Sequence, residues 1–188
     1  MKAITVSLLL LVCSEAFSQT EKGSTMIGGA LNLQTTKNNS NFSLTPNIGF
    51  LAARNFAIGG ALNLNFSKQG DVQNNLVGVG PFLRYYFGKT QTKPFLITAG
   101  RYLNVSSEST DPVTNLKTKT KTDGVGFLIG LGFAAFVNNV VAVEGLTGYN
   151  YSDFKNSSGS GGFTMRLGFQ LYFNKKSYSD LKTNVLGQ

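Results

Sequence analysis

Hydrophobic residues alternate with small or polar residues along most of the chain, and this period of two limits the fold more than any other feature. In the stretch FTMRLGFQLYF, every second residue from Phe163 to Phe173 is apolar. Successive side chains of a β-strand point to opposite faces, so the pattern predicts strands with one apolar face. Eight such runs predict an all-β, antiparallel, up-and-down protein, and they lie near residues 24–36, 42–53, 56–67, 75–87, 94–106, 123–136, 140–152 and 161–173.

These runs are long compared with the strands of most soluble proteins. A typical globular strand has about 5–6 residues, whereas a tilted strand that crosses a bilayer needs about 9–11. No apolar run reaches the ~20 residues that a transmembrane helix requires. If the chain enters a membrane, it must therefore do so as a closed barrel.

The connections between the runs differ in length at the two ends of the predicted barrel. At one end they are short, at residues 54–55, 88–93 and 137–139; at the other they are longer, at 37–41, 68–74, 107–122 and 153–160. Outer-membrane barrels have short periplasmic turns and longer outer loops. The long connection 107–122 is where we expect partner recognition, because rigid barrels carry their variable loops at the rim.

Composition decides which face looks outward. Charged residues make up 14% of the chain, against about 25% in ordinary soluble domains. A secreted lipocalin-like barrel, the soluble alternative, would carry charged side chains on its outer face. The polar faces here are mostly Gly, Ala, Asn, Ser and Thr, which suits the crowded lumen of an eight-stranded barrel. We therefore predict an eight-stranded transmembrane β-barrel with its apolar face outward.

The first eighteen residues have the organisation of a secretory signal peptide. Lys2 supplies the positive charge, residues 4–12 are apolar, and residues 16–18 form a small-x-small cleavage site. The predicted domains are this signal (1–18), the barrel (19–173) and a periplasmic tail (174–188). Cys13 is the only cysteine, so the mature chain can form no disulfide; lipid modification of Cys13 is the alternative processing route.

Charged residues within the runs predict a lumenal cluster of Arg84, Arg101, Glu144 and Arg166. An arginine facing lipid at mid-membrane costs about 2–4 kcal/mol, so these side chains are expected inside. Strand geometry places Arg84 and Glu144 roughly 8–10 Å from the short-turn end, with Arg101 and Arg166 near ~18 Å. Arg84–Glu144 is the favoured pair, with a reach from Glu144 to Arg166 left open. The cluster predicts a plug, and a gate or ion-selective constriction is the alternative.

Aromatic residues at the run ends predict interfacial girdles. Tyr85, Tyr86 and Phe87 lie at the short-turn end, and Tyr149 and Tyr151 lie toward the opposite end. Such girdles flank the lipid-facing band of membrane barrels.

The sequence lacks the residue types on which common catalytic sites depend. The chain has no histidine and its mature part has no cysteine, which excludes Ser–His and Cys–His catalysis and histidine-based metal sites. We predict no enzyme activity, no catalytic residues, no cofactor and no metal. The net charge of +8 raises nucleic acid as a partner, but charges on the long connections nearly cancel, so we expect none. The outward basic run 117–121 is a solvated loop or a contact for lipopolysaccharide phosphates.

The last run also carries a resemblance. Arg166, Gly168, Leu171 and Phe173 match the insertion signal that ends outer-membrane barrels. With the signal peptide and the eight runs, the chain resembles small OmpA/OmpX-type barrels, and it is especially similar to porin-family outer-membrane barrels of Bacteroidetes type. Those barrels end at the terminal aromatic residue, whereas this chain continues for residues 174–188.

The resemblance implies a location and partners. It implies a monomer in the Gram-negative outer membrane, surrounded by lipid and lipopolysaccharide and inserted by the barrel-assembly machinery. The predicted function is a structural or surface-interaction role through the extracellular loops. A narrow pore or a carrier of small solutes or hydrophobic ligands is the alternative.

Overall fold

The computed structural model describes residues 20–36, 39–70, 72–88, 90–110, 117–155 and 158–174. The predicted signal peptide and the tail beyond residue 174 lie outside these residues. No helix in the described ranges is long and apolar enough to cross a membrane.

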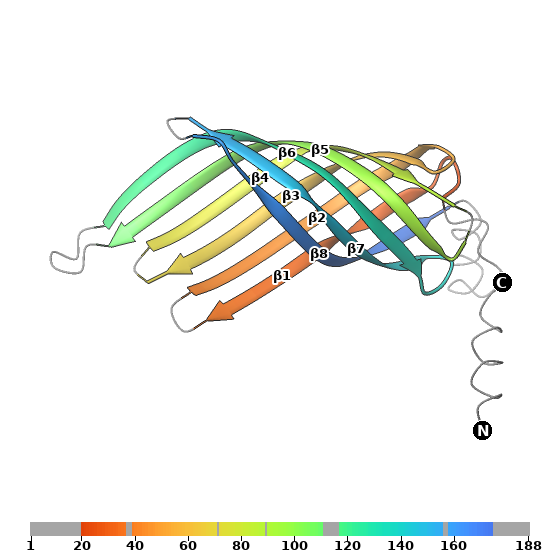
Figure 1. The fold of residues 1–188 in the computed structure, drawn as a ribbon, viewed down its shortest axis with the longest axis horizontal. Coiled ribbons are helices and arrows are strands. Elements are labelled where there is room, and N and C mark those ends of the chain that lie inside the picture. Colours follow the sequence, from red (N-terminus) through yellow and green to blue (C-terminus); the bar gives the residue numbers. More distant parts are fainter. Residues whose placement is uncertain are drawn as a thin grey trace, which may run out of the picture.

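Eight antiparallel strands form a closed barrel in sequence order, which confirms the predicted fold class (Figure 1). Each strand pairs with its neighbours in the chain, and β8 returns to β1. The strands are β1 (Thr25–Thr36), β2 (Asn39–Ala53), β3 (Phe56–Gln69), β4 (Val72–Tyr86), β5 (Thr92–Thr110), β6 (Lys117–Phe136), β7 (Val141–Phe154) and β8 (Ser160–Phe173).

The apolar faces of the strands point outward, as the alternation predicts. Large apolar side chains are exposed on all eight strands, including Ile27, Phe50, Leu62, Val79, Leu96, Phe127, Val143 and Leu167. The lumen is filled by small residues set opposite large ones. A Cβ added at Gly132 would meet the ring of Phe95, and one added at Gly59 would meet the ring of Phe82. Inward glycines therefore make room for the few aromatic rings that a narrow barrel can hold.

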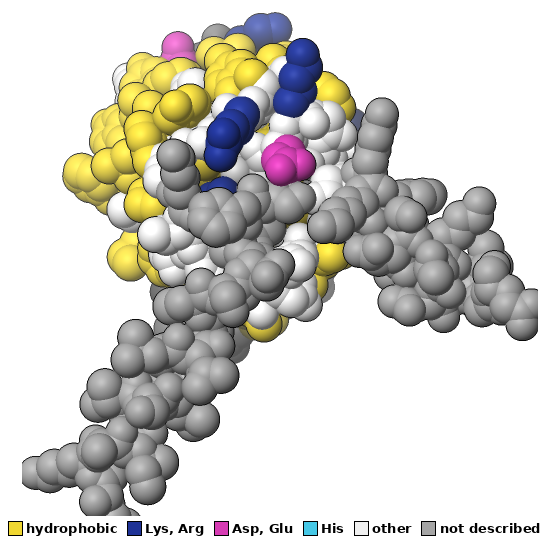
Figure 2. Space-filling model, turned by 90° about the vertical axis from the view of Figure 1, so that its right-hand side faces the viewer, with side chains coloured by type: hydrophobic (Ala, Val, Ile, Leu, Met, Phe, Trp, Pro, Cys, Tyr) yellow, Lys and Arg dark blue, Asp and Glu magenta, His cyan; other side chains and the backbone are white. Residues whose placement is uncertain are grey.

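The two ends of the barrel are named here by their connections. The tight-turn end carries the connections 54–55, 87–91 and 137–140, and the hairpin end carries 37–38, 70–71, 111–116 and 155–159. Asn55 sits in the first of these turns with φ 65°, a left-handed conformation that asparagine tolerates better than most residues. Figure 2 shows the tight-turn end, where polar and charged side chains gather over the middle and hydrophobic ones lie on the flanks.

The predicted difference in loop length between the two ends of the barrel is wrong, because some strands continue beyond the alternating hydrophobic residues. The stretch 107–122, expected to be a loop, is mostly strand, because β5 continues to Thr110 and β6 begins at Lys117. Backbone pairing continues there through polar residues, and Lys117 lies 3.3 Å from Glu108 across the hairpin. Ladder hydrogen bonds need no apolar side chain, whereas the alternation reports only the part of a strand that borders lipid.

Candidate functional site in the barrel lumen

The lower lumen, nearer the tight-turn end, holds a buried ion pair. Arg84 on β4 and Glu144 on β7 both point inward, and Nη1 of Arg84 donates hydrogen bonds to Oε2 (2.8 Å) and Oε1 (2.9 Å) of Glu144. Arg84 is only 5% exposed. A charge at this depth requires a partner, since an uncompensated buried charge is strongly destabilising.

Two tyrosines complete a ring of hydrogen bonds around this pair. Arg84 donates to the hydroxyl of Tyr86 (3.1 Å), and the hydroxyl of Tyr172 donates to Glu144 (2.9 Å). The two hydroxyls lie 2.7 Å apart; because Tyr172 uses its proton on Glu144, Tyr86 is the donor between them. The Arg84 guanidinium also lies 4.4 Å from the centre of the Phe95 ring. Side chains from β4, β5, β7 and β8 thus meet at one level of the lumen.

Tyr86 corrects one sequence prediction. It was expected in an interfacial girdle, but it is fully buried at 0% exposure. Its neighbour Tyr85 points outward and is exposed. Adjacent residues of a strand face opposite sides, so only one of the two can meet the membrane interface.

A second layer of polar contacts lies below the ring, at the mouth of the tight-turn end. Nζ of Lys93 donates to the hydroxyl of Thr20 (2.8 Å), which in turn donates to Oδ1 of Asn55 (2.6 Å). Thr20 and Lys93 are both buried. Sequence reasoning missed this layer, because Thr20 precedes the first alternating run and Lys93 was expected in a periplasmic connection.

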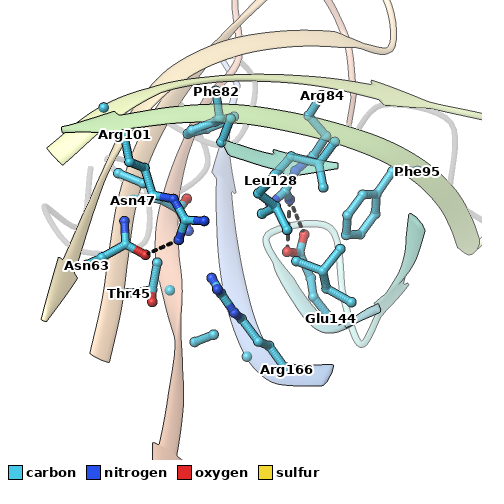
Figure 3. A pocket seen from close by; sticks show the side chains of 18 residues that line it. Thr45, Asn47, Asn63, Phe82, Arg84, Phe95, Arg101, Leu128, Glu144 and Arg166 are labelled. Carbon is cyan, nitrogen blue, oxygen red and sulfur yellow. Dashed lines mark hydrogen bonds and ion pairs between the residues drawn. The ribbon is translucent and has the colours of Figure 1, made fainter. Parts of the chain in front are cut away.

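The upper two arginines lie apart from the ion pair. Arg101 on β5 donates from Nη1 to Asn63 (3.1 Å) and from Nη2 to Asn150 (2.6 Å). Figure 3 shows Arg101 and Arg166 pointing toward the same space, away from the Arg84–Glu144 contact. The four charged residues of the lumen thus lie in two groups, and Glu144 pairs with Arg84 rather than with Arg166.

A cavity of about 70 Å³ separates the two groups. Its lining includes Arg84, Glu144, Arg101 and Arg166, with Asn63, Phe82, Phe95 and Leu128 among the other residues (Figure 3). A second lumenal cavity of about 220 Å³ shares Arg166 and is otherwise lined mainly by polar residues, including Asn32, Asn41, Ser43, Asn65 and Thr164. No group of three metal-ligating side chains occurs in the described ranges.

The residues of the predicted insertion signal lie along β8. Gly168 pairs with Ala30 of β1 and with Glu144 of β7, Leu171 pairs with Ile27, and Phe173 pairs with Thr25. A Cβ at Gly168 would meet the carbonyl oxygen of Gly29. The glycine therefore permits the close approach of β1 and β8 that closes the barrel.

The sequence matches no protein-family model and is not significantly similar to any curated protein. Solved structures share its fold. They include a major outer membrane protein from Thermus thermophilus (TM-score 0.54, 12% identity, 80% of this chain and 99% of that one). The outer membrane protein OprG from Pseudomonas aeruginosa (0.53, 11%, 82% and 97%) and Neisserial surface protein A, NspA (0.52, 16%, 80% and 95%), are similar to the same extent. At these identities the likeness concerns the fold alone.

Proposed function

We propose that this chain is a small integral outer-membrane protein whose lumen is closed to free solute flow by the ring of Arg84, Tyr86, Tyr172 and Glu144. The ring carries the proposal, because it joins β4 to β8. These strands lie four apart in an eight-stranded ring, which is the greatest separation available. Eight strands leave a lumen that side chains can fill.

The outward apolar faces support a membrane location. They present leucine, isoleucine, valine and phenylalanine to the surroundings on every strand, and such a surface is unfavourable in water. The likeness to outer-membrane barrels supports the same location. The polar extensions of β5 and β6 at the hairpin end support placing that end outside the cell and the tight-turn end in the periplasm. The terminal motif of β8 supports a porin-family barrel of Bacteroidetes type that the barrel-assembly machinery inserts. We further infer that residues 1–18 direct its export and that it works as a monomer without enzyme activity.

The proposed role is structural, or it is an interaction with other surfaces through the hairpin end of the barrel. The β5–β6 hairpin is built from the two longest strands, of 19 and 20 residues. Lys117, Lys119 and Lys121 are exposed on it and share one strand face by their spacing. This face suits contact with anionic surfaces such as lipopolysaccharide phosphates.

Refolding into lipid vesicles tests the proposal. The unboiled protein should migrate faster on a gel than the boiled protein, and the wild type should give no stable conductance across a planar bilayer. A triple variant, Arg84→Ala with Tyr86→Ala and Glu144→Ala, removes the side chains that cross the lumen and should conduct once folded. Equal conductance by the wild type would overturn the closed lumen. A protein that stays in solution without vesicles would overturn the membrane location.

A carrier function is the second candidate, and the lumenal cavities favour it. Above the ring lie a small, mostly apolar cavity and a larger polar one, and Arg166 lines both. A barrel that is closed below and hollow above can hold a small ligand without conducting.

A further inference from the structure

The barrel wall opens between β1 and β8 in its hairpin half. The two strands pair only from Thr25–Phe173 to Ala30–Gly168. β1 remains paired with β2 as far as Thr36, and β8 with β7 as far as Ser160. In Figure 1, β1 and β8 lie together near the tight-turn end and diverge toward the hairpin end. Residues 31–36 and 160–167 therefore form two facing strand edges.

Side-chain exposure marks the same opening. Large outward residues of β2 to β7, which have a strand on both sides, are at most 60% exposed, the value of Val125 and Leu131. Along the opening the exposed fractions rise to 89% for Phe163, 79% for Met165, 70% for Leu167 and 66% for Leu33. These residues are all apolar, so the opening lies within the band that faces lipid. Unpaired backbone groups are unfavourable there unless they line a cavity or a ligand covers them.

An apolar groove adjoins the opening. It has a volume of about 550 Å³, within the range of about 300–1,000 Å³ typical of ligand sites. Most of its lining is aliphatic or aromatic, and it contains one charged residue, Arg166. The apolar members include Leu31, Leu33, Leu131, Phe133, Met165 and Leu167.

Arg166 lies where the two strands part. It is the next inward residue of β8 beyond Gly168, which is the last residue paired with β1. It lines the groove and both lumenal cavities. An anion bound to Arg166 is thus within reach of the lumen and of the groove.

The two upper arginines have no counterion within the described part of the chain. The partners of Arg101 are the neutral amides of Asn63 and Asn150, and its Nε is buried without a hydrogen bond. The side chain of Arg166 has neither an ion pair nor a hydrogen bond to a described residue. Glu144, which lines the same cavity as both arginines, is held by Arg84. Two cations thus face one space with no negative charge of their own, which favours an anionic ligand.

We propose that Arg101 and Arg166 bind the anionic head of a single-chain amphiphile, with a long-chain carboxylate as the simplest example. The alkyl chain leaves the lumen between β1 and β8 and lies in the groove of Leu31, Leu33, Met165 and Leu167. Both halves of such a ligand are accommodated: the head gains charge-assisted hydrogen bonds, and the tail covers apolar surface and the open strand edges. The inference rests on the proposed membrane location.

Binding of radiolabelled dodecanoate to the folded barrel in nonionic detergent tests the head site. Arg166→Gln and Arg101→Gln should each weaken binding about ten- to a hundredfold, the loss expected for charged hydrogen bonds. Arg54→Gln, which removes an exposed arginine at the tight-turn end, is the matched control and should bind like the wild type. Unlabelled methyl dodecanoate and acetate should both compete poorly, because one lacks the charge and the other lacks the chain. Unchanged binding by Arg166→Gln, or equal competition by either compound, would overturn the proposal.

A disulfide across the opening tests the route of the alkyl chain. If the β1–β8 register continued beyond Ala30–Gly168, Leu33 would lie opposite Met165, so oxidation of a Leu33→Cys/Met165→Cys variant should close the opening and abolish binding. Reduction of the same sample should restore it. A control pair where β1 and β8 are paired, Ile27→Cys/Leu171→Cys, should leave dodecanoate binding equal in the oxidised and reduced protein. Binding that survives oxidation of the first pair would refute the opening as the route.

Heat-modifiable migration separates this inference from the proposed function. A barrel that folds in membranes but binds no dodecanoate would refute the amphiphile site and leave the membrane location standing. A chain that never folds in membranes would refute both.

Discussion

Replacing Glu144 with alanine tests the central contact of the lumen. The change removes both hydrogen bonds from Nη1 of Arg84 and the one from the Tyr172 hydroxyl. It leaves a cation at 5% exposure without a carboxylate. Breaking a buried ion pair by removing one partner costs about 3–5 kcal/mol of the free energy of unfolding.

Two features place the expected loss near the lower end of that range. The Arg84 guanidinium keeps its contact with the Phe95 ring, 4.4 Å from the ring centre, and a cation–π contact of this kind contributes about 1–2 kcal/mol. The cavity of about 70 Å³ beside the pair can also admit water to the freed charge. We therefore expect Glu144→Ala to lower the free energy of unfolding by about 3 kcal/mol.

Urea unfolding of the refolded barrel in lipid vesicles measures this loss, with the fast-migrating unboiled band as the folded fraction. Heat-modifiable migration should also be lost at a lower temperature. Glu108→Ala is the control, because it removes an exposed carboxylate whose partner Lys117 is also exposed, and such surface pairs contribute about 0–1 kcal/mol. The double variant Arg84→Leu/Glu144→Leu should recover most of the loss, since no buried charge remains. The reasoning fails if Glu144→Ala unfolds at the same urea concentration as Glu108→Ala.

Two further substitutions test the hydrogen-bonded ring around Arg84 and Glu144 and the contact between β1 and β8. Tyr172→Phe removes the hydroxyl that donates to Glu144 and should cost about 1.5–3 kcal/mol in the same urea assay, whereas Tyr149→Phe on the outer face should change little. Gly168→Ala places a methyl group against the backbone of β1 and should cost about 1–3 kcal/mol through overpacking. Gly162→Ala on the same strand has open space around its Cβ and should fold normally, so equal stability of the two alanine variants would contradict the close β1–β8 contact.

The alternation was sufficient to locate the strands and their faces, because lipid on one side and a narrow lumen on the other impose a period of two. It failed at the strand ends. Beyond the lipid-facing band, residues 107–110 and 117–122 are polar, yet they pair as strands. Alternation of side chains along the strand also separates the outward Tyr85 from the inward Tyr86, although the prediction of an aromatic girdle groups the two together.

The contacts in the lumen depend on more than parity, that is, on more than whether a residue's position along its strand makes it face inward or outward. Parity places Arg84, Glu144, Tyr86 and Tyr172 inward, but it does not say which of them meet. Arg84 and Glu144 are 60 residues apart and lie on strands that are not neighbours. Counting residues from the tight-turn end places them at similar heights, and the combined registers of β4–β5, β5–β6 and β6–β7 bring them together across the lumen. Thr20 gave no signal in the sequence, since it lies before the first alternating run.

The sequence by itself determined the eight strands, their order and the outward apolar face. Only the tertiary structure decided that Tyr86 and Tyr172 join the Arg84–Glu144 pair, and how far β1 and β8 pair before they part at Arg166. The reason lies in the register between strands. A slip of one residue exchanges the two faces and is forbidden by the hydrophobic pattern, whereas a slip of two residues keeps every side chain on its face. Such a slip moves a residue by about 6.8 Å along the strand, enough to make or break every contact in the lumen.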